Sequence, residues 1–136
     1  MATKPLAKKI ARLCFLKKAT DVVLLDIRKL SDVTDFFILC SGDSDIQVRA
    51  IANSIIDSSE KIGLSVWHKE GLETGNWAII DFVDVVVHVF QKQARSYYNL
   101  EKLWSDASKE KIEESKPKPI TKKTKTTKTK PTARKK

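Results

Sequence analysis

The stretch from Glu70 to Trp104 constrains the fold most strongly, because it holds two short apolar runs followed by a helical pattern. The runs at 77–82 and 85–90 are too short for separate helices and are rich in β-branched and aromatic residues, so they are predicted to be adjacent strands. From Gln91 to Trp104, aromatic and apolar residues recur at steps of three and four, which predicts one helix with an aromatic face toward the sheet. Recognition is expected first on a surface this rich in Trp, Tyr and His.

The segments that precede this stretch complete an α/β sandwich. An amphipathic helix of about four turns with a basic outer face is predicted after Pro5. Ser44 and Gln47 have the spacing of a capping box, which predicts the start of a second helix that ends near Gly63. The predicted fold is a mixed sheet of about five strands with helices packed on it. The first three of these strands are predicted at residues 21–27, 36–40 and 64–67.

The charge of the chain is unevenly distributed. The formal net charge is +9, but residues 115–136 hold ten Lys or Arg and no acid, so residues 1–114 carry 16 basic against 17 acidic residues. We therefore predict a folded domain at 1–114 and a disordered Lys/Thr/Pro-rich tail at 115–136, which cannot bury enough apolar area to offset its chain entropy. Such a tail favours sequence-independent attraction to nucleic-acid phosphates. Composition fits a merely solubilising extension as well.

One constellation suggests enzymatic chemistry. Nucleotidyltransferases use Gly-Ser followed by Asp-x-Asp, with a third carboxylate on a neighbouring strand, to hold the metal ions that orient a triphosphate. Here Asp43 and Asp45 follow Ser41-Gly42, and Asp81 or Asp84 could supply the third carboxylate. The competing interpretation is that both acids favour the start of a helix through its dipole, without a metal. Neither Cys14 nor Cys40 has a partner at metal-site spacing, and both are expected to be buried. We expect no cofactor, no metal and no enzymatic activity.

The sequence supports a binding protein better than it supports an enzyme. Four acidic residues are expected at loop and strand-end positions around Trp77, and such a rim would steer the surface toward a basic protein. The alternative is that Trp77 belongs to the core and the acids are solvated turn residues. His88 lies inside an apolar strand and is expected to be a hydrogen-bonded core or interface residue, whereas His68 is expected to be exposed. The four acids are Glu70, Glu73, Asp81 and Asp84.

No signal-peptide core or run of membrane-spanning length occurs in the sequence. The two cysteines fit a reducing compartment. We therefore expect a soluble, cytoplasmic protein without membrane partners.

Two long patterns stand close together, D-V-V-V-H-V-F at 84–90 and R-x-Y-Y-x-L-E-x-L-W at 95–104. Through them, the chain from about Asp21 to Asp106 resembles the ribosomal silencing factor (Iojap) family. The resemblance implies a nucleotidyltransferase-like fold and a non-enzymatic homodimer. It also implies that the protein binds large-subunit ribosomal protein uL14 and obstructs joining of the small subunit, which lowers translation.

The resemblance also assigns residues. By it, a partner-binding or dimer surface contains the motif positions Trp77, Asp84, His88, Arg95, Tyr97 and Tyr98. Val83 stands where the family usually has glycine between the last two strands, which changes the expected turn. The basic tail is not part of the family pattern, and contact with ribosomal RNA is an expectation from its charge alone.

Overall fold

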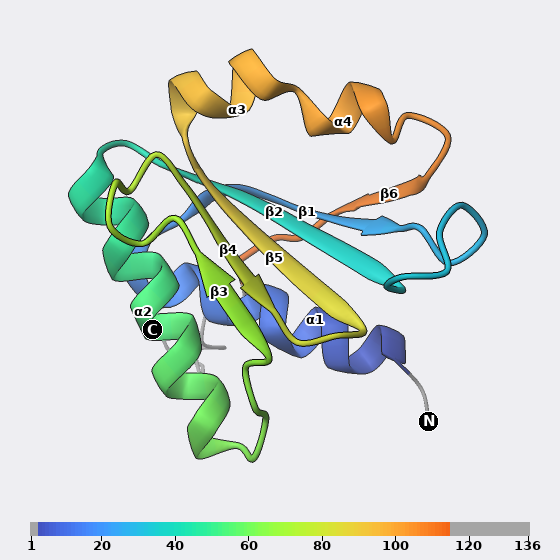
Figure 1. Ribbon diagram of the computed structural model, residues 1–136, viewed down its shortest axis with the longest axis horizontal. Coiled ribbons are helices and arrows are strands. Elements are labelled where there is room, and N and C mark those ends of the chain that lie inside the picture. Colours follow the sequence, from blue (N-terminus) through green and yellow to red (C-terminus); the bar gives the residue numbers. More distant parts are fainter. Residues whose placement is uncertain (1–2, 115–136) are drawn as a thin grey trace, which may run out of the picture.

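A mixed six-stranded sheet with helices packed on both faces forms the part of the chain that the computed structural model describes, residues 3–114 (Figure 1). The predicted tail at 115–136 lies outside the described residues. The helices are α1 (Thr3–Leu13), the 3-10 helix η1 (Cys14–Lys17), α2 (Asp45–Lys61), α3 (Lys92–Tyr98) and α4 (Leu100–Leu103). The strands are β1 (Thr20–Asp26), β2 (Phe36–Gly42), β3 (His68–Glu70), β4 (Trp77–Asp81), β5 (Val85–Gln91) and β6 (Ser108–Lys111).

The strand order is β3-β4-β5-β2-β1-β6. The central pair, β2 and β5, is parallel, and the other neighbouring strands are antiparallel. Strands β3 and β6 form the two edges. The predicted mixed α/β fold is confirmed, with six strands rather than about five.

Alternation along the strands gives the sheet two apolar faces. One face carries Ile38 and Val87 and is covered by α1 and α2, which contribute Ile10 and Ile51 to the larger core. The other face carries Leu25, Leu39 and Phe90 in a smaller core. On that side α3 and α4 pack over part of the sheet through Ala94, Leu100 and Trp104. We call this second side the open face, because the helices leave much of β4 and β5 uncovered (Figure 1).

The predicted capping box opens α2. The Ser44 hydroxyl accepts a hydrogen bond from the Gln47 backbone N–H at 3.1 Å, and the Gln47 side-chain oxygen accepts one from the Asp43 backbone N–H at 2.6 Å. The Gln47 amide nitrogen also donates to the carbonyl oxygens of Lys17 and Lys18. One side chain therefore caps α2 and fastens its start to the end of η1. Both cysteines are buried and free, as expected.

The helix predicted from Gln91 to Trp104 is wrong as a single element. Asn99 adopts left-handed backbone angles (φ 48°, ψ 56°), which end α3 at Tyr98 and separate it from α4. Asparagine tolerates this conformation better than other residues with a side chain, so it can serve as a helix terminator.

Two strand predictions also need correction. The third strand is His68–Glu70 and not 64–67, although the Trp67 backbone N–H already donates to the Asp81 carbonyl oxygen at 2.8 Å. Strand β6 was not predicted, because its sequence SKEK has no apolar alternation. It is formed by backbone pairing with the buried strand β1, from Val23↔Lys111 to Asp26↔Ser108.

Candidate protein-binding surface

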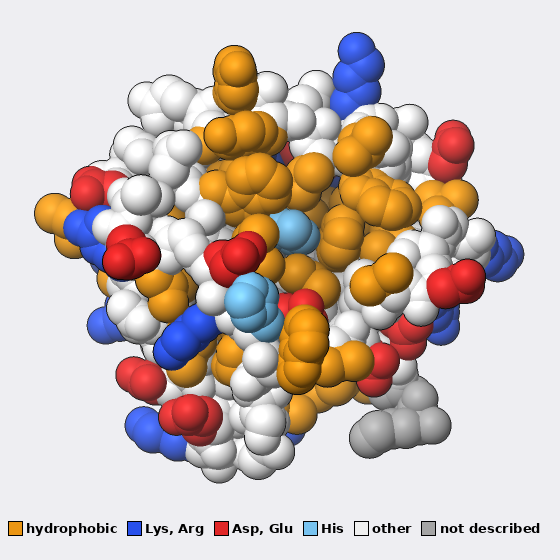
Figure 2. Space-filling model, in the orientation of Figure 1, with side chains coloured by type: hydrophobic (Ala, Val, Ile, Leu, Met, Phe, Trp, Pro, Cys, Tyr) orange, Lys and Arg blue, Asp and Glu red, His pale blue; other side chains and the backbone are white. Residues whose placement is uncertain are grey.

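An aromatic cluster covers the middle of the open face, where Figure 2 shows hydrophobic side chains gathered around a histidine. The Trp77 ring lies 4.7 Å from the Tyr98 ring, which joins β4 to α3. The Phe37 ring lies 5.4 Å from the Trp104 ring at a nearly perpendicular angle, which joins β2 to the end of α4. These edge and tilted arrangements are the favourable ones for aromatic pairs. The aromatic cluster comprises Phe37, Trp77, His88, Phe90, Tyr98 and Trp104.

His88 lies buried at the centre of this cluster, with 6% of its surface exposed. The Trp77 indole N–H donates to its Nδ1 at 3.1 Å, so the proton of the neutral ring is on Nε2. Nε2 is buried and has no hydrogen-bond partner among residues 3–114. Burial lowers the pKa of His88 to about 4, which keeps the ring neutral at physiological pH. His88 is therefore a buried, hydrogen-bonded residue of the cluster.

An apolar notch adjoins the cluster at the far end of β4 and β5. It has a volume of about 290 Å³ and is lined by Val33, Thr34, Trp67, Asp81, Val83 and Val86. Trp67 is 71% exposed and Val33 is 85% exposed, which is unusual for such large apolar side chains. Sequence reasoning missed both as site residues, because Trp67 was taken only as the end of the strand predicted at 64–67 and Val33 lies in a loop without a strand or helix pattern. Only their exposure in the fold reveals them.

The turn that joins β4 to β5 is strained at Val83. Its φ is 79°, and the Asp84 backbone N–H donates to the Phe82 carbonyl oxygen at 3.1 Å, which are the marks of a γ-turn with a positive φ at its centre. A β-branched residue rarely adopts a positive φ. The Asp81 carboxylate holds the turn by accepting from the Val83 backbone N–H at 2.7 Å. The chain thus retains a conformation suited to glycine while it presents an apolar side chain at the notch.

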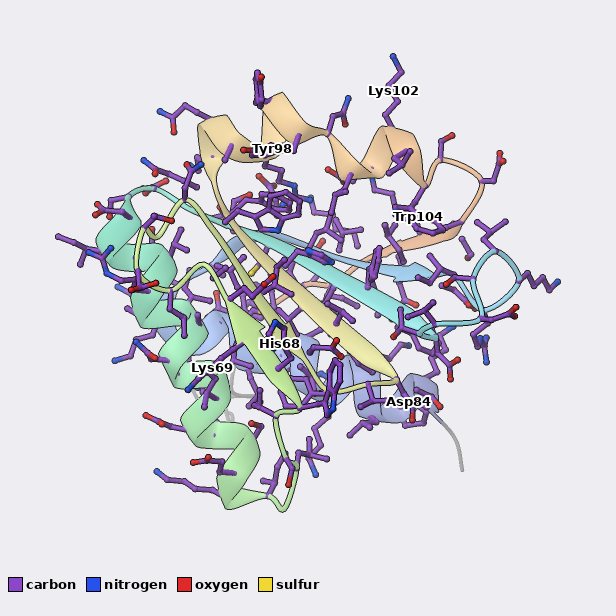
Figure 3. All side chains as sticks on the ribbon, in the orientation of Figure 1. His68, Lys69, Asp84, Tyr98, Lys102 and Trp104 are labelled. Carbon is purple, nitrogen blue, oxygen red and sulfur yellow. The ribbon has the colours of Figure 1, made fainter. Side chains whose placement is uncertain are left out.

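The four acids do not form one ring around Trp77. Asp81 and Asp84 lie near the notch, at the end of the β4–β5 hairpin remote from Tyr98 (Figure 3). Glu70 is on edge strand β3, opposite Ile79, where it approaches His68 at 3.4 Å. Three of the predicted acids therefore border the open face along its β3 and hairpin sides.

Glu73 and two motif residues have other positions. The Glu73 backbone carbonyl accepts from Arg49 of α2, away from the notch. The Arg95 guanidinium is largely buried and binds Glu101 at 3.1 Å, the Ser41 hydroxyl at 2.9 Å and the Asp21 carbonyl oxygen, so it fastens α3 to β1 and β2. Tyr97 is 82% exposed on α3. Arg95 is thus engaged within the fold rather than offered to a partner.

The geometry does not assemble the acids of the nucleotidyltransferase alternative. Asp43 follows the carboxyl end of β2, whereas Asp81 pairs with Val86 near the amino end of the parallel strand β5. The length of a seven-residue strand, about 20 Å, separates these positions. Asp45 forms an ion pair with Arg49 one turn later in α2. Between residues 3 and 114, no three His, Cys, Asp or Glu side chains are grouped closely enough to hold a metal ion.

None of the helices within residues 3–114 is long and apolar enough to cross a membrane.

Comparison with known proteins decides the family. The family model described as "Ribosomal silencing factor during starvation" matches residues 1–136. The chain belongs to this family. It is 48% identical to the ribosomal silencing factor of Bacillus subtilis over 107 residues, which cover 79% of this chain and 91% of the relative. It is also 38% identical to the chloroplastic Iojap protein of Zea mays over 91 residues, which cover 67% of this chain and 40% of that longer protein.

Two solved structures share the fold of this chain. A Chromobacterium violaceum protein superposes with a TM-score of 0.75 at 33% identity, covering 86% of this chain and 91% of that one. A Bacillus halodurans protein superposes with a TM-score of 0.68 at 40% identity, covering 82% of this chain and 99% of that one. The family is named for silencing ribosomes and not for a catalysed reaction.

Proposed function

We propose that this protein silences ribosomes in the cytoplasm by binding ribosomal protein uL14 of the large subunit through its open face, which blocks association of the small subunit. Family membership supports the ribosomal role. The observation that carries the surface assignment is the incompletely covered aromatic cluster beside the apolar notch, with Asp81 and Glu70 at its border. An apolar centre with a charged rim is the usual anatomy of a protein interface.

Steric exclusion is sufficient for this mechanism. A specific interface buries about 800 Å² on each partner, and occupying an area of that order on the subunit-joining face would exclude the small subunit by overlap. Trp67 and Tyr98 are exposed aromatic side chains of the kind that carry most binding energy at protein interfaces. The acids add steering toward a basic partner and raise the association rate more than the final affinity. Silencing then depends on occupancy, and no chemical step is involved.

A pair of exposed residues tests the surface without disturbing the core. In the Trp67→Ala/Asp84→Ala variant, we expect affinity for purified large subunits to fall by about tenfold or more, because one exposed aromatic anchor and one rim charge are lost. The measurement is co-sedimentation through a gradient, followed by a subunit-joining assay. Ile46→Ala is the matched control, because Ile46 is 69% exposed on α2, outside the notch and the cluster. Unchanged binding by the double variant would refute the surface assignment.

The proposal includes two further contacts. The protein is proposed to form a homodimer, and ribosomal RNA contact is proposed for the basic residues 115–136. Sedimentation velocity of the purified protein tests the dimer: a single species of monomer mass at micromolar concentration would remove it. If the dimer uses the open face, added uL14 should convert dimer to a one-to-one complex.

A further inference from the structure

We infer that the exposed side of α1 and η1 is a second binding surface, which binds the phosphate backbone of RNA and lies near the end of the described domain, where the basic tail sequence begins. This inference deepens the proposed RNA contact by giving it a site on the folded domain. We call this surface the α1 basic patch. It comprises Lys4, Lys8, Lys9, Arg12, Lys17 and Lys18.

The distribution of charge along the chain is the first observation. Of the 26 Lys and Arg residues, six lie in residues 1–18 and ten in residues 115–136, and neither segment contains an acid. The remaining ten lie between residues 19 and 114 together with all 17 acids, so that this central part has a formal charge of −7. The two ends of the chain are therefore strongly basic and its centre is acidic.

The fold brings the basic helix α1 to the edge of the sheet at which the described part of the chain ends. Glu110 of β6 forms ion pairs with Lys8 at 3.2 Å and Lys4 at 3.7 Å, which places α1 beside the last strand. Two residues later, the Ile112 backbone N–H donates to the Val22 carbonyl oxygen, and its side chain packs against the core that α1 covers. The tail sequence begins at residue 115, just after this anchored point.

Most of the α1 basic patch is available to a ligand. Lys9, Arg12, Lys17 and Lys18 are exposed and form no ion pair with any residue in the described part of the chain. Cations on a rigid helix that form no ion pair within the described part of the chain match a polyanion rather than a single small anion.

RNA fits this patch better than a membrane surface. Helices that lie on lipid need large apolar residues beside their cations. In α1 and η1 most of the apolar residues face the core: Ile10 and Cys14 are fully buried and Phe15 is half-buried. Of the large apolar residues in these two helices, only Leu16 is substantially exposed. The patch lies on the helices of the face that α1 and α2 cover, whereas the aromatic cluster lies on the opposite, open face of the sheet, so the domain can contact a protein and RNA at the same time.

The test uses the full chain and a fluorescent RNA duplex of about 16 base pairs, with the binding constant measured at several KCl concentrations. For Lys9→Ser/Arg12→Ser/Lys17→Ser we expect at least about tenfold weaker binding at about 100 mM KCl. The slope of log K against log [KCl] should become smaller in magnitude by about two to three, because each phosphate contact that is lost means about one fewer counterion released on binding. The matched control, Lys29→Ser/Lys61→Ser/Lys69→Ser, changes the net charge equally at exposed positions elsewhere. Thermal unfolding verifies that both variants remain folded.

The outcomes separate the alternatives. Equal RNA binding by the two triple variants would overturn the inference. It would also be overturned if deletion of residues 115–136 removes all binding while the α1 variant binds like wild type. If the Lys9→Ser/Arg12→Ser/Lys17→Ser variant loses binding to anionic phosphatidylglycerol vesicles but keeps its RNA binding, the patch is assigned to membranes and the inference is overturned as well. The Trp67→Ala/Asp84→Ala variant should keep full RNA affinity, so failure of the uL14 proposal is distinguishable from failure of this one.

Discussion

Buried His88 makes the stability of this domain depend on pH in a window where carboxylates contribute little. Burial lowers its pKa from an ordinary value of 6.5 to about 4, and its Nδ1 accepts the Trp77 hydrogen bond that holds the aromatic cluster together. Below pH 6.5 the unfolded chain takes up a proton at this position and the folded chain does not. The free energy of unfolding therefore falls as the pH drops from 6.5 toward 4 and is fully retained above 6.5.

The size of the effect follows from the two pKa values. Linkage gives a loss of about 2 kcal/mol between about pH 7.5 and pH 5, from a ring that is neutral in the fold and mostly charged in the unfolded chain at the lower pH. Urea unfolding at several pH values measures it. His88→Gln should be less stable near pH 7.5, because the cluster loses a packed ring, but its stability should change little down to about pH 5. His68→Gln is the control, because that side chain is half exposed.

Two results would refute this reasoning. One is an equal loss of stability over the same pH range in wild type and His88→Gln. The other is a nuclear magnetic resonance titration in which the His88 ring of the folded protein protonates near its ordinary pKa of 6.5. Either would mean that the ring is hydrated enough to carry charge inside the cluster.

Three further substitutions probe other parts of the domain. Arg95→Met should lower the free energy of unfolding in urea by about 2 to 3 kcal/mol, because Glu101 and Ser41 lose a largely buried partner; a loss below about 0.5 kcal/mol would show that the ion pair behaves as an exposed one. Gln47→Ala should cost about 1 kcal/mol in the same assay, since it removes the side-chain half of the α2 capping box and the link to η1 while the Ser44 cap remains, and an unchanged midpoint would contradict that role. Val83→Gly should leave stability within about 1 kcal/mol, because relief of backbone strain offsets the added chain entropy, while large-subunit affinity falls; intact affinity would show that the side chain makes no contact.

The sequence was most informative where burial and local hydrogen bonds decide the structure. The runs at 77–82 and 85–90 became β4 and β5 because alternate residues on them are buried on opposite faces. The Ser44 and Gln47 pair opened α2 because both partners of its hydrogen bonds are close in the chain. Neither required knowledge of the rest of the fold.

Predictions failed where distant segments decide the outcome. Strand β6 exists because β1 offers it a backbone edge, and its residues carry no apolar signal for this. The notch joins Val33 of one loop to Trp67 and Val83 of two others, a meeting that no local pattern encodes. The acids expected around Trp77 were divided because Asp81 stands at the opposite end of β4, Glu70 pairs with Ile79 in mid-strand, and the loop that carries Glu73 is held by Arg49 of α2.

The parallel pairing of β2 with β5 has a kinetic consequence. It joins residues about 50 positions apart, so the centre of the sheet closes only after a large loop has been ordered. Substitutions at this junction should slow folding, whereas changes in late-joining β6 should mainly speed unfolding. Since β5 also carries His88 and Phe90 of the aromatic cluster, a nascent chain should acquire the proposed binding face only when this closure is complete.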